Sequence, residues 1–107
     1  MYKVVLVKFP YIEKTKFKIR PGILLSPQSW GKHKLIVVAY ITSQPPEKIA
    51  TEILIAPTKK NGLRHKSVIR LHKLATVSSS VLFSEIGCLT PAQSSEVKNK
   101  LRQMFDI

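Results

Sequence analysis

The arginine and hydroxyl side chains of this 107-residue chain are its best candidates for chemistry, above all Arg20, Thr42 and Arg70. Because proline cannot donate to a sheet ladder, Pro21 is expected at the entry of a strand over residues 22–26. Arg20 would then lie at the rim of the sheet, with its side chain pointing out of the core. An arginine keeps its charge and offers a planar fork of donors that matches phosphate oxygens. Arg20 is therefore predicted to begin an anion-binding, catalytic site.

Three polar side chains follow the apolar run from residue 35 to residue 41. These are Thr42, Ser43 and Gln44, and the Pro45-Pro46 pair after them cannot continue a ladder. Three hydrogen-bonding groups are thus expected beside a rigid turn at the end of a strand. Thr42 is a candidate for catalysis, and Ser43 and Gln44 are candidates for ligand binding. Simple turn chemistry is the alternative.

The stretch from Ser67 to His72 alternates as a half-buried strand does. Ile69 and Leu71 fall on one face. Arg70 and His72 fall on the other face, about 6–7 Å apart along the strand. Histidine transfers protons readily near neutral pH, and arginine stabilises negative charge. Arg70 and His72 are therefore predicted to be catalytic, with a structural role as the alternative.

The sequence shows no metal-binding pattern among these candidates or elsewhere. Cys88 and the three histidines show no zinc-like spacing, and the 6 carboxylates are scattered along the chain. No glycine-rich nucleotide-binding loop occurs. RNA can be cleaved without a metal when its 2′-hydroxyl attacks the adjacent phosphate, provided that the enzyme moves two protons and stabilises the phosphorane charge. The sequence therefore favours metal-independent RNA cleavage with no cofactor.

The charge of the chain is strongly biased, with 18 lysines and arginines against 6 acidic residues and a net charge of +12. No acidic residue occurs between Ile53 and Phe83, a stretch that includes a basic loop around an Asn61-Gly62 turn signal. Such a field favours a polyanion or an acidic protein as partner, with a solvated surface as the simpler alternative.

A second basic stretch, residues 14–18, would place lysines on one face of an extended arm backed by an aromatic ring. It is a plausible wall for single-stranded nucleic acid, and a mobile hydrophilic hairpin fits its composition equally well. The residues predicted to bind RNA are Lys14, Lys16, Phe17, Lys18, Ser43, Gln44, Lys59, Lys60, Arg64, His65 and Lys66.

The hydrophobic pattern predicts a mainly β fold with a C-terminal helix. Strands are expected over residues 2–9, 22–26, 34–42, 51–55, 67–72 with an extension to 77, and 83–89. Thr90-Pro91-Ala92-Gln93 is a capping box with proline at the first helical position. The helix that follows would pack through an apolar stripe of Val97, Leu101, Met104 and Phe105. The fold class is a small antiparallel barrel closed by one helix, in a single domain over residues 1–107.

The number of cysteines and the hydropathy of the chain indicate the cellular compartment. One cysteine, Cys88, excludes an internal disulfide framework and fits a reducing environment. The longest apolar run is far too short to span a membrane, and no cleavable leader is apparent at the start of the chain. A cytoplasmic protein without a membrane association is expected.

The same residues resemble the MazF/PemK family of type II toxin–antitoxin toxins, which are sequence-specific endoribonucleases (mRNA interferases). The resemblance extends over nearly the whole chain. Four blocks carry it in order: Val4-Val5-Leu6-Val7-Lys8-Phe9-Pro10-Tyr11, Arg20-Pro21-Gly22-Ile23-Leu24-Leu25-Ser26, Ile41-Thr42-Ser43-Gln44, and Ser67-Val68-Ile69-Arg70-Leu71-His72-Lys73-Leu74-Ala75-Thr76.

The resemblance implies a Src-homology-3-like barrel of the PemK/CcdB type and a homodimer with a groove for single-stranded mRNA at its interface. It also implies a small cognate antitoxin whose acidic segment occupies that groove. Arg20 would contact the scissile phosphate and stabilise the transition state, with the hydroxyl of Thr42 as its partner. Arg70 would supply a second cation or an acid.

Three positions depart from the family pattern, and all three shift charge toward positive. His72 stands where the family usually has an acidic residue, Tyr2-Lys3 replaces a common Gly-Asp pair, and Lys8 replaces a frequent Asp. His72 could take over acid–base work, or the chain could be a non-catalytic RNA-binding barrel. A third alternative is a toxin that inhibits a protein target such as a topoisomerase. That mode needs an exposed C-terminal end, so burial of Met104 and Phe105 would count against it.

Overall fold

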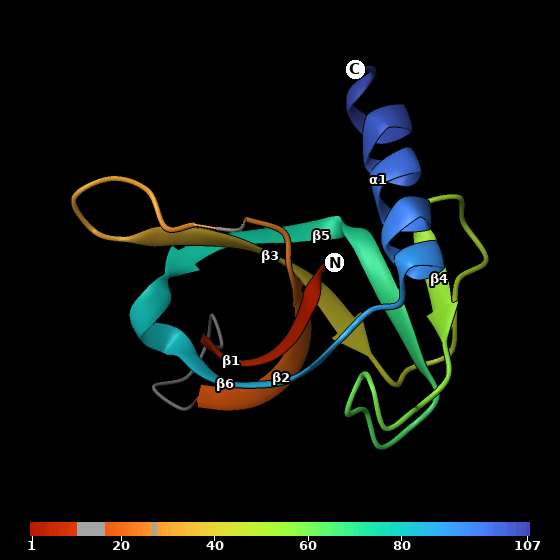
Figure 1. Ribbon diagram of the computed structural model, residues 1–107, viewed down its shortest axis with the longest axis horizontal. Coiled ribbons are helices and arrows are strands. Elements are labelled where there is room, and N and C mark those ends of the chain that lie inside the picture. Colours follow the sequence, from red (N-terminus) through yellow and green to blue (C-terminus); the bar gives the residue numbers. More distant parts are fainter. Residues whose placement is uncertain (11–16, 27) are drawn as a thin grey trace.

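The computed structural model describes residues 1–10, 17–26 and 28–107. The described chain consists of strands and one long C-terminal helix (Figure 1), which confirms the predicted mainly β class. The strands are β1 (Lys3–Pro10), β2 (Phe17–Leu24), β3 (Leu35–Thr42), β4 (Glu52–Ile55), β5 (Ser67–Ser78) and β6 (Leu82–Cys88). A short 3-10 turn, η1 (Ser79–Val81), precedes β6, and the helix α1 spans Pro91–Phe105.

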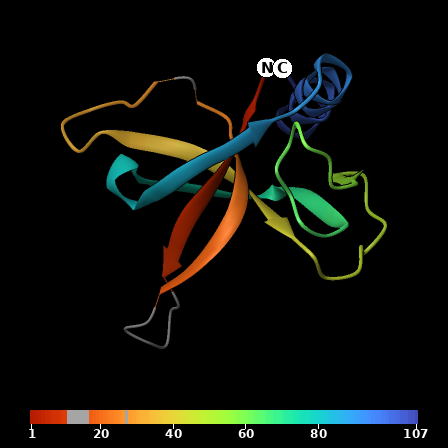
Figure 2. The ribbon, with the colours of Figure 1, turned by 60° about the horizontal axis from the view of Figure 1, so that its bottom comes forward.

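The strands form one antiparallel sheet in the order β4-β5-β3-β2-β1-β6. Figures 1 and 2 show that this sheet curls strongly, so that β1, β2 and β6 lie across the interior from β3 and β5. Val4 packs in one hydrophobic cluster, whereas Val5 and Val7 pack in another. Apolar residues on both sides of β1 are therefore covered.

The strand that carries Arg20 begins earlier than the sequence predicted. β2 starts at Phe17, and Pro21 lies inside it, opposite Leu6 of β1, instead of marking its entry. The physical reason is that β2 pairs with β3 only from Gly22 onward. At Pro21 the strand therefore has β1 as its one neighbour, and a missing N–H is tolerated at such an edge position.

β5 is the longest strand, and it pairs with β4 on one side and with β3 on the other. Its pairing with β3 shifts register between Ala39, which faces Leu74, and Tyr40, which faces Arg70. The intervening residues therefore leave the β3 ladder, and Leu71 donates its backbone N–H to the carbonyl of Thr51 at 3.0 Å instead. Ile69 and Leu71 lie in the core cluster near the helix, as the alternation predicted.

The helix begins at the predicted cap and packs through only part of its apolar stripe. Thr90 Oγ1 accepts from the backbone N–H of Gln93 at 3.1 Å, and Gln93 Oε1 accepts from the N–H of Thr90 at 2.9 Å. Val97 is fully buried, and Leu101 and Met104 pack against the core. The last turns extend away from the sheet (Figure 1), so Phe105 remains 54% exposed, contrary to expectation.

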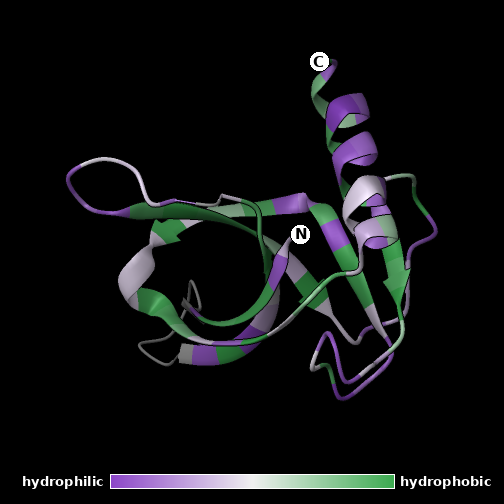
Figure 3. Ribbon diagram, viewed as in Figure 1, coloured by the Kyte–Doolittle hydropathy of each residue, from purple (hydrophilic) through white to green (hydrophobic). Residues whose placement is uncertain are grey.

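Apolar residues dominate the strands, whereas the loops and the outer helix surface are hydrophilic (Figure 3). This pattern explains how a chain of high net charge still folds around two clusters of buried aliphatic side chains. Polar residues thus lie mainly in the loops and on α1, whereas the strands supply most of the buried apolar side chains.

Candidate functional site

A cavity of about 400 Å³ lies where β2, the end of β3 and the β4–β5 loop meet. Its lining includes Arg20 from β2, Thr42 and Ser43 from β3 and its end, and Arg64 and His65 from the loop. We call it the Arg20 cavity. Five residues that the sequence singled out from three separate segments are therefore brought together.

The Arg20 cavity is electropositive. Two arginines and a histidine line it, and none of the described residues in its lining is acidic. Arg20 is only partly exposed, because it sits within β2 and not at its tip. A guanidinium held in a walled site interacts with an anion more strongly than one on an open surface, since less water screens it.

Thr42 is held in a defined orientation at the end of β3. Its side chain is largely buried, and its Oγ1 accepts a hydrogen bond from the backbone N–H of Gln44 at 3.1 Å. That bond uses a lone pair of the hydroxyl oxygen, so the hydroxyl proton remains the group to offer to a ligand. Thr42 can thus donate to an anion bound beside Arg20.

The loop that supplies Arg64 and His65 is fixed from inside by Asn61. The side chain of Asn61 is 1% exposed. Its Oδ1 accepts from the backbone N–H groups of Thr58 and Leu63, both at 3.0 Å. Its Nδ2 donates to the carbonyl of Ala56 at 2.9 Å. The loop is therefore built around one buried amide, and its cationic side chains start from a fixed backbone.

The same loop is pressed against β6 at two glycines. Gly62 has a φ of +70°, and a Cβ there would collide with the backbone of Ile86. A Cβ on Gly87 would collide with the carbonyl of Lys60, which accepts from Cys88 N–H at 2.9 Å. The predicted turn at Asn61-Gly62 is confirmed, and the left-handed backbone explains the glycine.

Arg70 lies outside the described lining of the Arg20 cavity. It stands directly opposite Glu52 across the β4–β5 ladder, and its Nε lies 3.5 Å from Glu52 Oε2. Both side chains are largely buried, and Arg70 Nη2 donates to the carbonyl of Pro45 at 3.5 Å. The structure thus pairs this predicted catalytic cation with a carboxylate that the sequence had not linked to it.

Glu52 is held in its charged form. Burial of the carboxyl would raise its pKa, but backbone N–H groups of residues 47–49 and the nearby Arg70 charge outweigh burial, so the pKa lies below its ordinary value. Glu52 Oε1 accepts from Lys48 N–H at 2.9 Å and from Ile49 N–H at 3.4 Å. The Glu52–Arg70 pair therefore links the segment before β4 to β5.

His72 also lies away from the described lining of the Arg20 cavity. It is exposed, and its Nδ1 is 2.7 Å from Thr51 Oγ1. Together with the Arg70–Glu52 pair, this contact places both predicted residues beside β4. Neither Arg70 nor His72 is among the described residues that line the Arg20 cavity.

The basic residues predicted to bind RNA are distributed unevenly. Lys14, Lys16 and the side chain of Phe17 lie outside the described part of the chain. Lys18 is exposed at the start of β2, and Lys59 and Lys60 are exposed on the loop without lining the Arg20 cavity. Lys66 and Gln44 line a neighbouring cavity that shares Ser43 with it. Of the described basic residues, Arg20, Arg64 and His65 thus line the Arg20 cavity, and Lys66 lines its neighbour.

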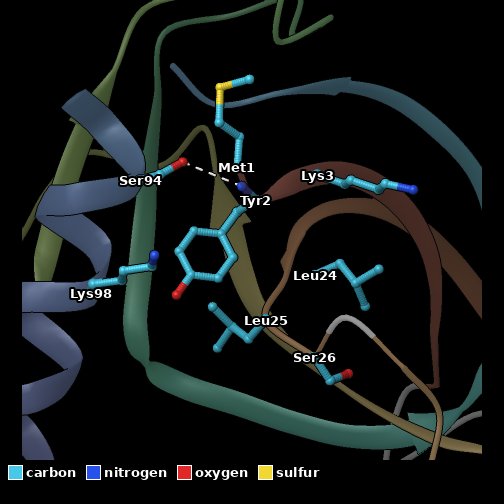
Figure 4. A pocket seen from close by; sticks show the side chains of 8 residues that line it. All are labelled: Met1, Tyr2, Lys3, Leu24, Leu25, Ser26, Ser94 and Lys98. Carbon is cyan, nitrogen blue, oxygen red and sulfur yellow. Dashed lines mark hydrogen bonds between the residues drawn. The ribbon is translucent and has the colours of Figure 1, made fainter. Parts of the chain in front are cut away.

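A separate cavity of about 400 Å³ lies between the N-terminus, the end of β2 and α1 (Figure 4). Tyr2, Leu25 and Lys98 line it, and the backbone N–H of Tyr2 donates to Ser94 Oγ at 3.3 Å. Burial raises the pKa of the Tyr2 phenol, and the Arg102 charge opposes that rise. This cavity includes none of the predicted site residues among its described lining.

Two further findings concern the described residues only. No three histidine, cysteine or acidic side chains lie close enough together to hold a metal ion. No helix in this part of the chain is long and apolar enough to cross a membrane.

Solved toxin structures share this fold. Mycobacterium tuberculosis toxin MazF-mt6 superposes with a TM-score of 0.76 at 23% identity, over 98% of this chain and 97% of that one. A mycobacterial endoribonuclease in complex with its cognate antitoxin gives a TM-score of 0.73 at 15% identity, over 98% and 92%. A comparison with curated protein sequences gave no significant match. The curled sheet with its terminal helix is thus the fold of a class of small β toxins.

The sequence itself specifies the family within that class. The model for PemK-like, MazF-like toxins of type II toxin–antitoxin systems matches residues 1–105. The chain belongs to this family, as its resemblance in the four sequence blocks implied. Toxins of the family are generally endoribonucleases.

Sequence reasoning missed three residues that shape the site. Asn61 was read only as part of a turn, because its burial inside the loop is not visible in the sequence. Glu52 was not linked to Arg70, because cross-strand register cannot be read from one sequence. Tyr40, which lines the Arg20 cavity, was read as part of an apolar strand.

Proposed function

We propose that this toxin is a metal-independent, sequence-specific endoribonuclease that cleaves single-stranded mRNA. The observation that carries the proposal is the Arg20 cavity, in which Arg20, Thr42 and His65 line one electropositive, walled space. These three types of side chain supply charge stabilisation, a fixed hydroxyl donor and a group able to move protons near neutral pH.

The proposed reaction is an in-line attack of the ribose 2′-hydroxyl on the adjacent phosphorus. The 2′-O–P bond forms as the 2′-hydroxyl loses its proton, and the P–O5′ bond breaks as the leaving oxygen gains one. The products are a 2′,3′-cyclic phosphate and a 5′-hydroxyl. Arg20 and Arg64 stabilise the charge on the non-bridging oxygens, and the Thr42 hydroxyl donates a hydrogen bond to one of them.

His65 is the proposed proton-transfer residue. It is exposed, it lines the Arg20 cavity, and the loop that carries it is fixed by Asn61. His72 was the sequence-based candidate, but its hydrogen bond to Thr51 holds it beside β4. Arg70 is likewise assigned a supporting role, because its guanidinium is engaged by Glu52 and by the Pro45 carbonyl.

The proposed partners are single-stranded mRNA, a second copy of the toxin and a cognate acidic antitoxin. The net charge of +12 favours both RNA and an acidic segment. The solved mycobacterial endoribonuclease with its cognate antitoxin offers a precedent for such a complex in the same fold. A homodimer would place two Arg20 cavities on one assembly.

The proposal is tested by incubating the purified toxin with a long RNA of mixed sequence in EDTA. Cleavage at a limited set of sites, with 5′-hydroxyl and cyclic-phosphate ends, is expected. If the toxin binds RNA in a salt-sensitive manner but cleaves none of many sequence contexts, it is a non-catalytic RNA-binding barrel.

A toxin that inhibits a protein target is the second candidate, and one observation favours it. Phe105 is 54% exposed and Ile107 is 85% exposed at the free end of α1, whereas Met104 packs against the core. Removal of residues 105–107 separates the two functions. The endoribonuclease should retain its cleavage rate, whereas a protein-directed toxin should lose its toxicity.

A further inference from the structure

A larger cavity, of about 550 Å³, adjoins the Arg20 cavity. We call it the Gln44 cavity. Ser43 and Ser67 line both cavities, so the two spaces adjoin at the end of β3 and the start of β5. No role has been assigned to this second space so far.

The walls of the Gln44 cavity are mainly apolar, and Gln44 and Lys66 add polar groups beside the two serines. Pro45, Pro46 and Leu54 supply apolar surface, and Leu54 is 70% exposed although it lies on a strand. Gln44 brings an amide with one acceptor and two donors, and Lys66 brings an ammonium group. An apolar slot with an amide in its wall suits a flat ring with a polar edge.

A nucleobase is such a ring. Proteins that read single-stranded RNA hold unstacked bases between aromatic or apolar side chains and hydrogen-bond the base edges. An amide side chain can make two hydrogen bonds to one base edge, which discriminates between bases. The exposed apolar surface of Leu54, beside the prolines, offers a contact for the face of the ring.

The order of residues along the chain puts the Gln44 cavity next to the position proposed for the scissile phosphate. Thr42 lines the Arg20 cavity, Ser43 lines both cavities, and Gln44 lines the second one. The hydrogen bond from Gln44 N–H to Thr42 Oγ1 fixes these residues relative to one another. A phosphate held by Arg20 and Thr42 would therefore have an adjoining base directed toward Gln44.

The wall that carries Gln44 is also rigid. The Pro45-Pro46 pair restricts φ at two successive residues. The Pro45 carbonyl accepts from Arg70 Nη2 at 3.5 Å, and Arg70 is in turn held by Glu52. A wall fixed before the ligand arrives loses little entropy on binding.

We propose that the Gln44 cavity holds the nucleobase next to the scissile phosphate, and that Gln44 reads the edge of that base. This proposal rests on the endoribonuclease function proposed above. The net charge of +12, Lys66 in the lining and the position next to the Arg20 cavity favour a polyanionic strand that occupies both spaces. An apolar side chain of an acidic peptide is the competing occupant.

The first test is cleavage of an RNA pool with randomised sequence, read by sequencing of the 5′-hydroxyl ends. The wild type should prefer one base at a position adjoining the cleaved bond. Gln44→Ala should reduce that preference about tenfold or more and leave the preferences at other positions unchanged. Gln103→Ala, on the exposed side of α1, is the matched control and should match the wild type.

The second test measures binding, so that it does not depend on catalysis. The probes are oligoribonucleotides with a 2′-deoxy sugar at the cleaved position, varied one base at a time. If no cleavage is found, an equivalent series of defined sequences is used. Gln44→Ala should flatten the affinity differences at one position. Leu54→Ala should weaken binding of every base there, whereas Leu35→Ala should not.

The outcomes separate this proposal from the function on which it rests. If the wild type does not cleave RNA but has a base preference that depends on Gln44, the endoribonuclease function is contradicted. The base-reading cavity is then supported. Unchanged preferences in Gln44→Ala in both tests overturn the proposal. So does a Gln44→Ala variant that loses only its affinity for a labelled, leucine-containing acidic peptide, because the cavity would then be a peptide-docking site.

Discussion

Arg20 and Arg70 lie on strands of the same sheet, yet their surroundings differ completely. Arg20 lines an open cavity in which no described lining residue is acidic. Arg70 is largely buried against Glu52 and a backbone carbonyl. One guanidinium has the capacity to bind a ligand, whereas the other is already neutralised within the protein.

This difference shows that residue type does not decide function at a strand position. An arginine that faces a carboxylate across a ladder contributes to structure, because that carboxylate balances its charge. An arginine beside a hydroxyl and a second cation is available to an anion. The comparison predicts that variants of the two residues will affect different properties.

The largest effect is expected for Arg20→Ala. Loss of a charge-stabilising donor should lower the single-turnover cleavage rate by roughly 100- to 1000-fold. Binding of RNA should weaken much less, because one cation among many contributes little to total affinity. Arg102→Ala, an exposed arginine near the end of α1, is the control and should leave the rate unchanged. Equal losses in both variants would show that only overall charge matters.

Arg70→Ala should act mainly on stability. Removing one member of a buried ion pair leaves the carboxylate of Glu52 unpaired, so the Tm should fall by several degrees in a thermal melt. Replacement of both residues, Arg70→Leu with Glu52→Leu, should recover part of that loss, since no buried charge is then left alone. A wild-type Tm for Arg70→Ala would argue against the structural role.

Asn61→Ala tests whether the loop needs its internal anchor. Loss of the buried amide leaves backbone donors of Thr58 and Leu63 without a partner and should destabilise the protein by roughly 1–3 kcal/mol in urea unfolding. Cleavage should slow as well, because His65 then starts from a mobile loop. Asn99→Ala, exposed on α1, should change neither property.

The smallest effect concerns acid stability. The pKa of Glu52 is lower in the folded protein than its ordinary value of 4.5, so the unfolded state binds more protons at acid pH. Its contribution to stability is therefore complete above about pH 4.5 and is lost as the pH falls through the folded pKa. Glu52→Gln should show a shallower loss of Tm below pH 4.5 than the wild type. Parallel curves would exclude Glu52 as a source of that dependence.

The strands and the helix could largely be predicted from the sequence, because local patterns determine them. The capping box at Thr90 and the alternation of Ile69 and Leu71 were confirmed. The start of β2 was predicted wrongly, since Pro21 was read as an interruption although β2 has one neighbour there. Single-sequence reasoning does not give the number of neighbours that a strand has at each residue.

The candidate site could be predicted in part. Arg20, Thr42, Ser43, Arg64 and His65 were all singled out by residue type and position, and they line one cavity. The ion pair of Arg70 with Glu52 could not be foreseen, because it depends on the register that puts Glu52 opposite Arg70. Long-range register is set by packing of the whole sheet and not by local sequence.

The most direct measurement compares single-turnover RNA cleavage by Arg20→Ala and Arg70→Ala in EDTA, at a temperature at which both variants are folded. We expect a loss of roughly 100-fold or more for Arg20→Ala, and a rate close to that of the wild type for Arg70→Ala. The reverse order would show that Arg70, and not Arg20, is the cation that stabilises the transition state.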